Sequence, residues 1–246
     1  MNIQEITLNI WPAKYFFFHN GWIIRVSEGT TKRANSVLPN FYYGENVQKD
    51  VLRVENIYKK FSLPPIFQIA DYVNPSNLDE VLDEMGYRKD SKTYVLTSST
   101  PILTQKIPDN NYTIEINSSL TENWLKTNQK FLKDTDKVID DKKAILNRLL
   151  IPETNYFIIR QSDELLGVAL GIMYETIMGI FEVVINPNHR RKNIATILMN
   201  YMFQFANNND VELIFLQVVE NNKPAMSLYK KLGLKKLFSY HYRIND

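Results

Sequence analysis

Residues 180–205 read IFEVVINPNHRRKNIATILMNYMFQF, and residues 212–234 read ELIFLQVVENNKPAMSLYKKLGL. Each piece starts with a short apolar run and continues with apolar residues at helical spacing, which predicts a strand followed by a helix in both. Gly233 comes directly after the second helix, where a residue in the left-handed conformation commonly ends a helix. The order strand, turn, helix, strand, helix indicates an α/β fold.

A basic turn, His189-Arg190-Arg191-Lys192-Asn193, separates the first strand from the first helix. A helix N-terminus carries N–H groups without intrahelical partners and the positive end of the helix dipole, so it attracts anions. Three consecutive cations next to the small residues Ala195 and Thr196 suggest a pyrophosphate site. A solvated basic turn at an ordinary α/β crossover has the same charges, and the charge run alone leaves both readings open.

The two pieces together resemble the core of the GCN5-related N-acetyltransferases (GNAT). That family has a V-x-P strand end, then (Q/R)-x-x-G-x-(G/A), and later N-x-x-A-x-x-L-Y-x-x-x-G-F. The matching residues here are Ile185-Asn186-Pro187, Arg190 to Ala195, and Asn222 to Leu234. Asn193 stands where the family usually has Gly, and Leu234 where it usually has Phe. Because Asn tolerates the left-handed conformation better than most residues, we expect the turn to survive.

The composition limits the class of protein. With 246 residues, 44% of them hydrophobic and 23% charged, the chain can form one large domain or two small ones. It has no cysteine, which excludes disulfides and thiolate nucleophiles, and its three histidines show no metal-ligand spacing, so we expect no metal. A formal net charge of +2 argues against nucleic-acid or membrane partners. No signal-peptide pattern or membrane-length apolar run is present, and we expect a cytoplasmic protein.

The predicted elements repeat along the chain. Gly86 and Gly233 are 233 − 86 = 147 positions apart, and the same offset places residues 65–70 on 212–217, 77–85 on 224–232 and 93–97 on 240–244. We therefore expect an α/β (α+β) protein with two tandem GNAT-like mixed sheets flanked by helices, in domains 1–105 and 112–246. Residues 98–111, which are rich in Pro and small polar residues, form the predicted linker.

The first half lacks the chemical groups of the second. Tyr229 falls on Leu82, and Asn193 falls on Glu45 when Pro39 is matched to Pro187. An acidic residue at this position would repel a pyrophosphate, so we expect a degenerate N-terminal domain without a co-substrate site. Its sequence also resembles the leading half of bacterial tandem GNAT proteins, in the stretches Trp11–Ala13, Gly21–Arg25, Arg33–Val37 and, at the chain end, Tyr240–Arg243.

Elsewhere the pattern predicts a hairpin at Asn20-Gly21 and a strand over residues 33–38. Helices are predicted over residues 46–61, 120–132 and 137–150. We expect the region 120–150, including Trp124, to contribute to recognition of the acceptor substrate.

The resemblance implies that acetyl-CoA is the acyl donor. In the family it is wedged between two strands that separate, with its pantetheine arm along one strand and its pyrophosphate on the N–H groups of the basic turn. The implied binding residues are Val183, Val184, Ile185, Arg190, Arg191, Lys192, Asn193, Ile194, Ala195, Thr196 and Asn222.

Tyr229 is the predicted general acid, because the family places this phenol beside the sulfur and a neutral phenol can protonate a leaving thiolate. The general base is less defined. Some family members have a Glu where this chain has Gln217, and Glu182 is the nearest carboxylate on the strand before the turn. Strand alternation places Glu182 on the opposite face from Val183 and Ile185, and a β-bulge would reverse this. Glu220 and Glu175 are alternatives, and so is proton loss through water.

The sequence thus predicts an N-acetyltransferase acting on a primary amine, either a small molecule or a peptide. Three alternatives stay open: a CoA-binding sensor or scaffold without turnover, a transferase with another acyl donor, and a doubled α/β interaction protein. A homodimer is also compatible with the sequence.

Overall fold

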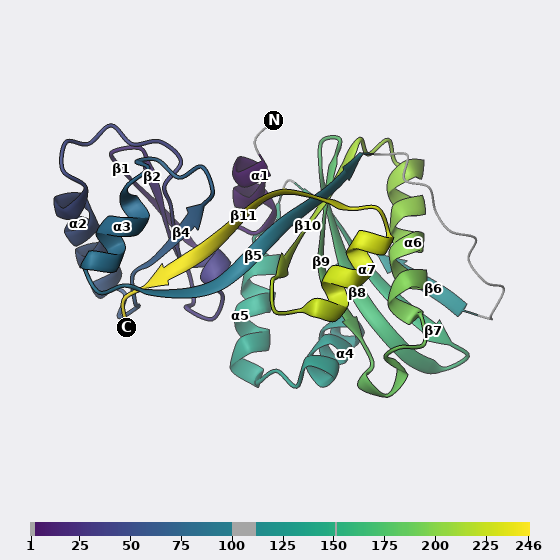
Figure 1. The fold of residues 1–246 in the computed structure, drawn as a ribbon. Helices are drawn as coiled ribbons and strands as arrows, with labels where there is room; N and C mark the ends of the chain where they lie inside the picture. The colour runs from purple at the N-terminus through teal and green to yellow at the C-terminus, as the bar shows by residue number, and fades with distance from the viewer. Residues whose placement is uncertain (1–2, 100–111, 151) are drawn as a thin grey trace. The chain divides into compact units, whose positions relative to one another are not determined.

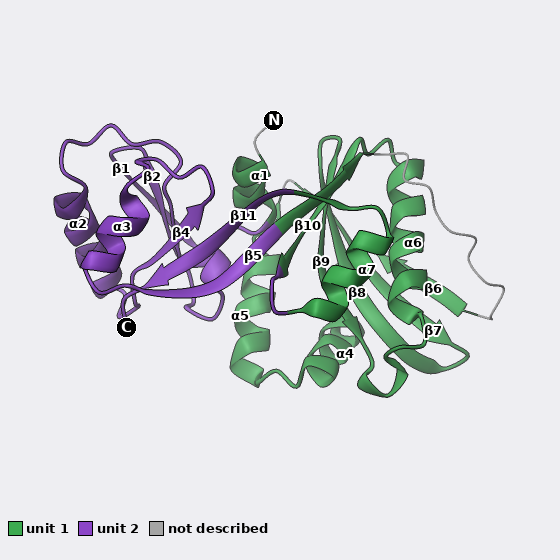
Figure 2. Cartoon of the chain, viewed as in Figure 1, with its two compact units in different colours: residues 1–10, 95–218, 222–236 green, residues 11–94, 219–221, 237–246 purple. Residues whose placement is uncertain are grey.

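The computed structural model describes residues 3–99, 112–150 and 152–246 (Figure 1). The chain divides into two compact units (Figure 2): unit 1 comprises residues 1–10, 95–218 and 222–236, and unit 2 comprises residues 11–94, 219–221 and 237–246. These units differ from the predicted domains 1–105 and 112–246, because each of them takes residues from both halves of the chain. In the described part of the chain, no helix combines the length and the hydrophobicity of a membrane span.

Unit 1 is a mixed sheet covered by helices. Its strand order is β10-β9-β8-β7-β6, with the end of β5 next to β10. Neighbours from β6 to β9 are antiparallel, whereas β9 and β10 are parallel. Its elements are α1 (Ile3–Ile10), β6 (Tyr112–Asn117), α4 (Glu122–Leu132), α5 (Asp136–Leu146), β7 (Glu153–Gln161), β8 (Glu164–Tyr174), β9 (Ile177–Ile185), α6 (Ile194–Asn208), β10 (Leu213–Val219) and α7 (Lys223–Lys231).

Local sequence explains where the helices of unit 1 begin. Thr121 accepts a hydrogen bond from the backbone N–H of Trp124 at 3.2 Å, and Thr135 accepts one from Val138 at 3.4 Å, so both hydroxyls cap a helix. Helices α1, α4 and α6 pack against β8, whose central residues 166–173 are all buried. Since alternate residues of a strand face opposite sides, the helices cover both faces of this strand.

Unit 2 has the strand order β1-β2-β3-β4-β11-β5. The last strand of the chain, β11, pairs antiparallel with β4, with Tyr240 opposite Ala70. Strands β5 and β11 contribute residues to both units. The elements are β1 (Tyr15–His19), β2 (Trp22–Val26), the 3₁₀ helix η1 (Lys32–Ala34), β3 (Val37–Leu38), α2 (Val47–Lys59), β4 (Ile66–Ala70), α3 (Leu78–Glu84), β5 (Arg88–Ser99) and β11 (Lys235–Ile244).

The elements recur at the predicted offset. Strand β4, helix α3 and strand β5 begin at positions 66, 78 and 88, and adding 147 gives 213, 225 and 235. Strand β10, helix α7 and strand β11 begin at 213, 223 and 235. The repeat of pattern seen in the sequence is therefore a repeat of secondary structure, in register to within two residues.

The predicted hairpin is confirmed, with Asn20 at φ 46° and Gly21 at φ 88°. The predicted strand over residues 33–38 is wrong in its first half, where η1 forms a turn. The Asn35 side chain ties this turn together, since it accepts from the N–H of Ser27 at 2.7 Å and donates to the carbonyl of Thr31 at 2.8 Å. Of the predicted linker, residues 98 and 99 belong to β5 and residues 100–111 lie outside the described ranges.

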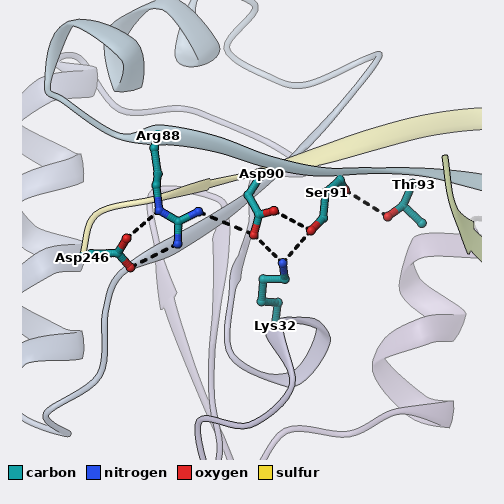
Figure 3. Close-up of polar contacts among 6 residues, drawn as sticks. All are labelled: Lys32, Arg88, Asp90, Ser91, Thr93 and Asp246. Carbon is teal, nitrogen blue, oxygen red and sulfur yellow. Dashed lines mark hydrogen bonds and ion pairs between the residues drawn. The ribbon is translucent and has the colours of Figure 1, made fainter. Parts of the chain in front are cut away.

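A polar network fixes η1 to β5 within unit 2 (Figure 3). The ammonium group of Lys32 lies 2.5 Å from the Asp90 carboxylate and donates to the Ser91 hydroxyl at 2.7 Å. Arg88, on the same strand, pairs with the C-terminal residue Asp246 at 2.5 Å. These are partly exposed ion pairs, which contribute little each, and they anchor the end of the chain to β5.

Candidate functional site

Strands β9 and β10 separate halfway along their length. Their parallel pairing runs from Ile177–Leu213 to Ile180–Leu216 and stops there. Both strands continue, β9 to Ile185 and β10 to Val219, without pairing to each other. On its other side β9 stays paired with β8 as far as Ile185. The predicted residues Val183, Val184 and Ile185 therefore lie on the diverging part of β9, as the wedge arrangement requires.

A β-bulge marks the point of divergence. The β8–β9 register shifts between Val168 and Leu170, and Glu182 has φ 50°, in the left-handed region. Val184 is buried, whereas Val183 and Ile185 are half-buried. The bulge that the sequence left open thus exists, and it breaks the simple alternation of faces at Glu182.

Glu182 does not lie free in the site, because two residues hold its carboxylate. Its Oε2 accepts from Lys142 Nζ at 2.7 Å and from Asn128 Nδ2 at 3.2 Å. Lys142 in turn donates to Asn128 Oδ1 at 2.6 Å and lies 3.3 Å from Asp134. The other carboxylate oxygen, Oε1, has no hydrogen-bond partner among the described residues. One oxygen of Glu182 is anchored, and the second is available.

The sequence reading missed Lys142 and Asn128. The Lys142 side chain is only 9% exposed, although the charge pattern of its helix suggests a solvated face. A signal was present: Lys142 shares the buried side of α5 with Ile139, Ile145 and Leu146. A lysine within an apolar helical stripe needs a buried partner, which here is Glu182.

Trp124 contradicts its predicted part in substrate recognition. It is fully buried, stacks edge-on against Tyr156 and donates its indole N–H to the carbonyl of Ala169 at 3.0 Å. Ala169 lies on β8 opposite the bulge, between Val168 and Leu170. Trp124 therefore supports the wall of the site without being accessible to a ligand.

The basic turn has the backbone geometry of an anion site. A 3₁₀ turn, η2 (Pro187–His189), follows β9. Arg191 and Asn193 then adopt left-handed conformations, with φ 65° and 62°. Asn193 is the N-cap of α6, so the residue that replaces the usual Gly takes the conformation a Gly would supply.

The start of α6 lacks a side-chain cap, since Asn193 makes no capping hydrogen bond. The first N–H groups of a helix have no partner inside the helix, which here applies to Ile194, Ala195 and Thr196. The three cations of the turn, Arg190 to Lys192, are exposed. Within the described ranges no carboxylate forms an ion pair with any of them. Both features favour a bound anion.

Helix α7 (Lys223–Lys231) lies between the two motif residues Asn222 and Gly233. Asn222 caps it by accepting from the N–H of Ala225 at 3.2 Å, and Leu234 N–H closes its end on the carbonyl of Tyr229. Tyr229 is the one buried residue of this helix, at 8% exposure. Burial raises the pKa of its phenol to about 12. With this pKa the phenol is protonated at neutral pH. Its hydroxyl has no hydrogen-bond partner among the described residues.

The alternative bases, Glu175 and Glu220, have different surroundings from Glu182. Glu175 is in the turn between β8 and β9, at the opposite end of β9 from Ile185. Glu220 belongs to unit 2, where it accepts from the Tyr94 hydroxyl at 2.5 Å and pairs with Lys92 at 3.4 Å. Glu182 lies on β9 two residues beyond Ile180, where the pairing with β10 stops. In the described residues, no group of three or more His, Asp and Glu side chains is arranged to hold a metal ion.

The sequence is similar to a known protein family and to a protein named as an N-acetyltransferase. Residues 118–234 match the acetyltransferase (GNAT) family. A Bacillus subtilis (strain 168) protein named uncharacterized N-acetyltransferase YobR is 26% identical over 243 residues, which are 98% of this chain and 97% of that protein.

Two solved structures share the fold at low sequence identity. A GCN5-related N-acetyltransferase from Kribbella flavida is 12% identical with a TM-score of 0.75, over 98% of this chain and 95% of that chain. A tandem GNAT protein from the clavulanic acid biosynthesis pathway, without AcCoA, is 10% identical with a TM-score of 0.63, over 80% of this chain and 69% of that chain. The α/β fold expected from the sequence is confirmed by these likenesses.

Proposed function

We propose that this protein, whose residues 118–234 form an acetyltransferase (GNAT) domain, is an N-acetyltransferase that transfers an acetyl group from acetyl-CoA to a primary amine. The observation that carries the proposal is the separation of β9 from β10 beyond Ile180 and Leu216. The uncapped helix start that follows the left-handed residue Asn193 supports it.

The residues present fit acetyl-CoA. The diverging part of β9, over Val183 to Ile185, exposes backbone groups that β10 does not pair with, and a pantetheine amide can pair with them as a strand would. The N–H groups at the start of α6 and the side chains of Arg191 and Lys192 would hold the pyrophosphate. Asn222 follows β10 and caps α7 with its side-chain oxygen. It would contact the pantetheine from the side opposite β9. When bound, acetyl-CoA supplies the activated acyl group as a thioester.

Tyr229 would protonate the departing thiolate. Its phenol stays neutral across the physiological pH range because burial raises its pKa to about 12. The raised pKa also makes it a weaker acid, so we expect it to act mainly by donating a hydrogen bond as charge develops on the sulfur, with the proton following.

Glu182 would receive the acceptor amine. Its free Oε1 can accept a hydrogen bond from the amine, while Lys142 and Asn128 hold the other oxygen. Since the ammonium form of an amine has no lone pair to attack the carbonyl, a proton must leave it first, to Glu182 or to water.

Thermal unfolding with acetyl-CoA, with CoA and with ATP tests donor binding before any amine is known. A ligand at 100 times its Kd stabilises a protein by about 2.7 kcal/mol, which corresponds to a shift of roughly 5–10 °C for a chain of this size. We expect this shift with acetyl-CoA and CoA but not with ATP. No shift at millimolar acetyl-CoA would refute the donor site.

Turnover is tested next with panels of acyl-CoA donors and of amines, by following release of the CoA thiol. Because the chain has no cysteine, thiol detection has no background from the protein. Release that depends on both acetyl-CoA and an amine supports the proposal. Preference for another acyl group would change the donor, and tight binding without turnover on any amine would favour a CoA-binding sensor, the alternative that Gln217 motivates.

A further inference from the structure

Unit 2 presents an unusual edge strand. Strand β1 reads YFFFH, and Tyr15, Phe16, Phe17 and Phe18 are all exposed, Phe18 by 76%. Two more exposed aromatics, Phe41 at 63% and Tyr43 at 75%, lie in the loop that covers the hairpin turn, where the N–H of Tyr43 bonds to the carbonyl of Asn20 at 3.2 Å. We call these six residues the aromatic edge.

The backbone of β1 is also open on one side. Among the described residues, β1 pairs with β2 alone, in a register that closes on His19 and Trp22 around the two-residue turn. Residues that flank such a turn form a hydrogen-bonded pair, and the pairs alternate from there. Phe16 and Phe18 are therefore in non-hydrogen-bonded pairs, and their N–H and C=O groups point away from β2.

A bond on the next strand supports this assignment. Arg25, opposite Phe16, uses its N–H toward the carbonyl of Ser36 on the far side of β2, at 3.4 Å. If Arg25 faces away from β1, then Phe16 faces away from β2. The outer edge of β1 thus offers two sets of backbone donors and acceptors, two residues apart.

Such an edge is normally protected by charged residues, proline or a bulge. Strand β1 has none of these within Tyr15–Phe18, and Lys14 lies just before it, over the ring of Tyr15. From the exposed fractions, the aromatic edge leaves on the order of 500–800 Å² of aromatic surface in solvent. A stable interface needs about 800 Å² per partner, so this surface is close to sufficient for one.

We propose that the aromatic edge is a homodimer interface in which β1 pairs antiparallel with β1 of a second copy. The strand is complementary to itself about Phe17: the outward backbone groups of Phe16 meet those of Phe18 from the partner copy, and the reverse. Phe17 then faces Phe17 of the other copy in a non-hydrogen-bonded pair, where side chains are closest. The pairing satisfies both sets of backbone groups and buries aromatic surface on both faces of the strand.

Sedimentation equilibrium on the full chain tests the proposal, with Phe18→Lys as the disrupting variant. Leu150→Lys is the matched control, because it adds the same charge at an exposed apolar residue of unit 1. We expect wild type and Leu150→Lys to have twice the chain mass of 28.9 kDa. Phe18→Lys should raise the dimer dissociation constant about a hundredfold or more, while its far-UV circular dichroism spectrum stays that of the wild type.

A Phe17→Cys variant tests the register. The chain has no cysteine, so this thiol is the single one in each copy, and mild oxidation should yield a disulfide-linked dimer. A Phe16→Cys variant, which faces Phe18 of the partner, should cross-link much less. A monomeric wild type at 100 µM, including one that sediments with lipid vesicles, would overturn the proposal. So would a dimer that Phe18→Lys leaves intact, or equal cross-linking at the two cysteine positions.

Discussion

Replacing Lys142 by Met should destabilise unit 1, because the Glu182 carboxylate would lose its cation while staying partly buried. The two side chains are 9% and 19% exposed and their charged atoms lie 2.7 Å apart. Removing one partner of a buried pair costs about 3–5 kcal/mol, and the partial exposure of Glu182 lowers our expectation to about 2–4 kcal/mol. For Glu182→Gln we expect about 1–3 kcal/mol, since Lys142 keeps Asn128 and Asp134.

The double variant measures the interaction free energy between Lys142 and Glu182 separately from their contacts with other residues. If Lys142 and Glu182 act on each other, Lys142→Met combined with Glu182→Gln should cost less than the sum of the single changes, by about 1–3 kcal/mol. Equilibrium urea denaturation followed by far-UV circular dichroism and tryptophan fluorescence gives these values, with Trp124 in unit 1 and Trp11 and Trp22 in unit 2 all contributing to the fluorescence.

Lys143→Met is the matched control on the same helix. Lys143 pairs with Glu122 at 3.4 Å, but the side chains are 47% and 67% exposed, so we expect a change of at most about 0.5 kcal/mol. Single-variant effects that add to within about 0.5 kcal/mol, or a Lys142→Met effect no larger than that of the control, would refute the buried-pair argument.

Four further outcomes follow from the site. Tyr229→Phe should lower kcat by one to three orders of magnitude and leave acetyl-CoA affinity nearly unchanged, and equal rates would remove Tyr229 from the mechanism. Because burial raises the Tyr229 pKa to about 12 while the unfolded phenol titrates near 10, its contribution to stability is complete below pH 10 and lost above it. Denaturation at pH 9 and 11 should therefore show about 1.4 kcal/mol less alkaline loss in Tyr229→Phe than in wild type, and parallel losses would contradict the assignment. Arg191→Glu should weaken acetyl-CoA binding in calorimetry at least tenfold, whereas the same charge change at the exposed Arg53 of unit 2 should not, and equal affinities would move the pyrophosphate elsewhere. Asn193→Ala should lower the melting temperature by roughly 2–4 °C through about 1 kcal/mol of left-handed strain, and Asn193→Gly should not, so a neutral Ala variant would contradict the observed φ of 62°.

The order and type of the elements were readable from the sequence, because periodicity and helix-end residues are local. Helix α7 between Asn222 and Gly233 and the hairpin at Asn20-Gly21 depend on neighbours within a few residues. The repeat at 147 positions compares two such local patterns. The left-handed conformation of Asn193 could also be predicted from the sequence, because Asn adopts this conformation more readily than most residues.

Which strands pair, and which side chains meet, was decided only by the tertiary structure. Three features depend on pairing between segments far apart in the chain. They are the pairing of β11 with β4, the point where β9 separates from β10, and the position of the bulge. Glu182 meets Lys142 across 40 positions, and a lysine in a mixed-charge helix carries no local mark of that partner except its place in the apolar stripe. The sequence alone determined a fold and the location of the basic turn before α6. The environment of each charged group was set by burial, which only the packed chain defines.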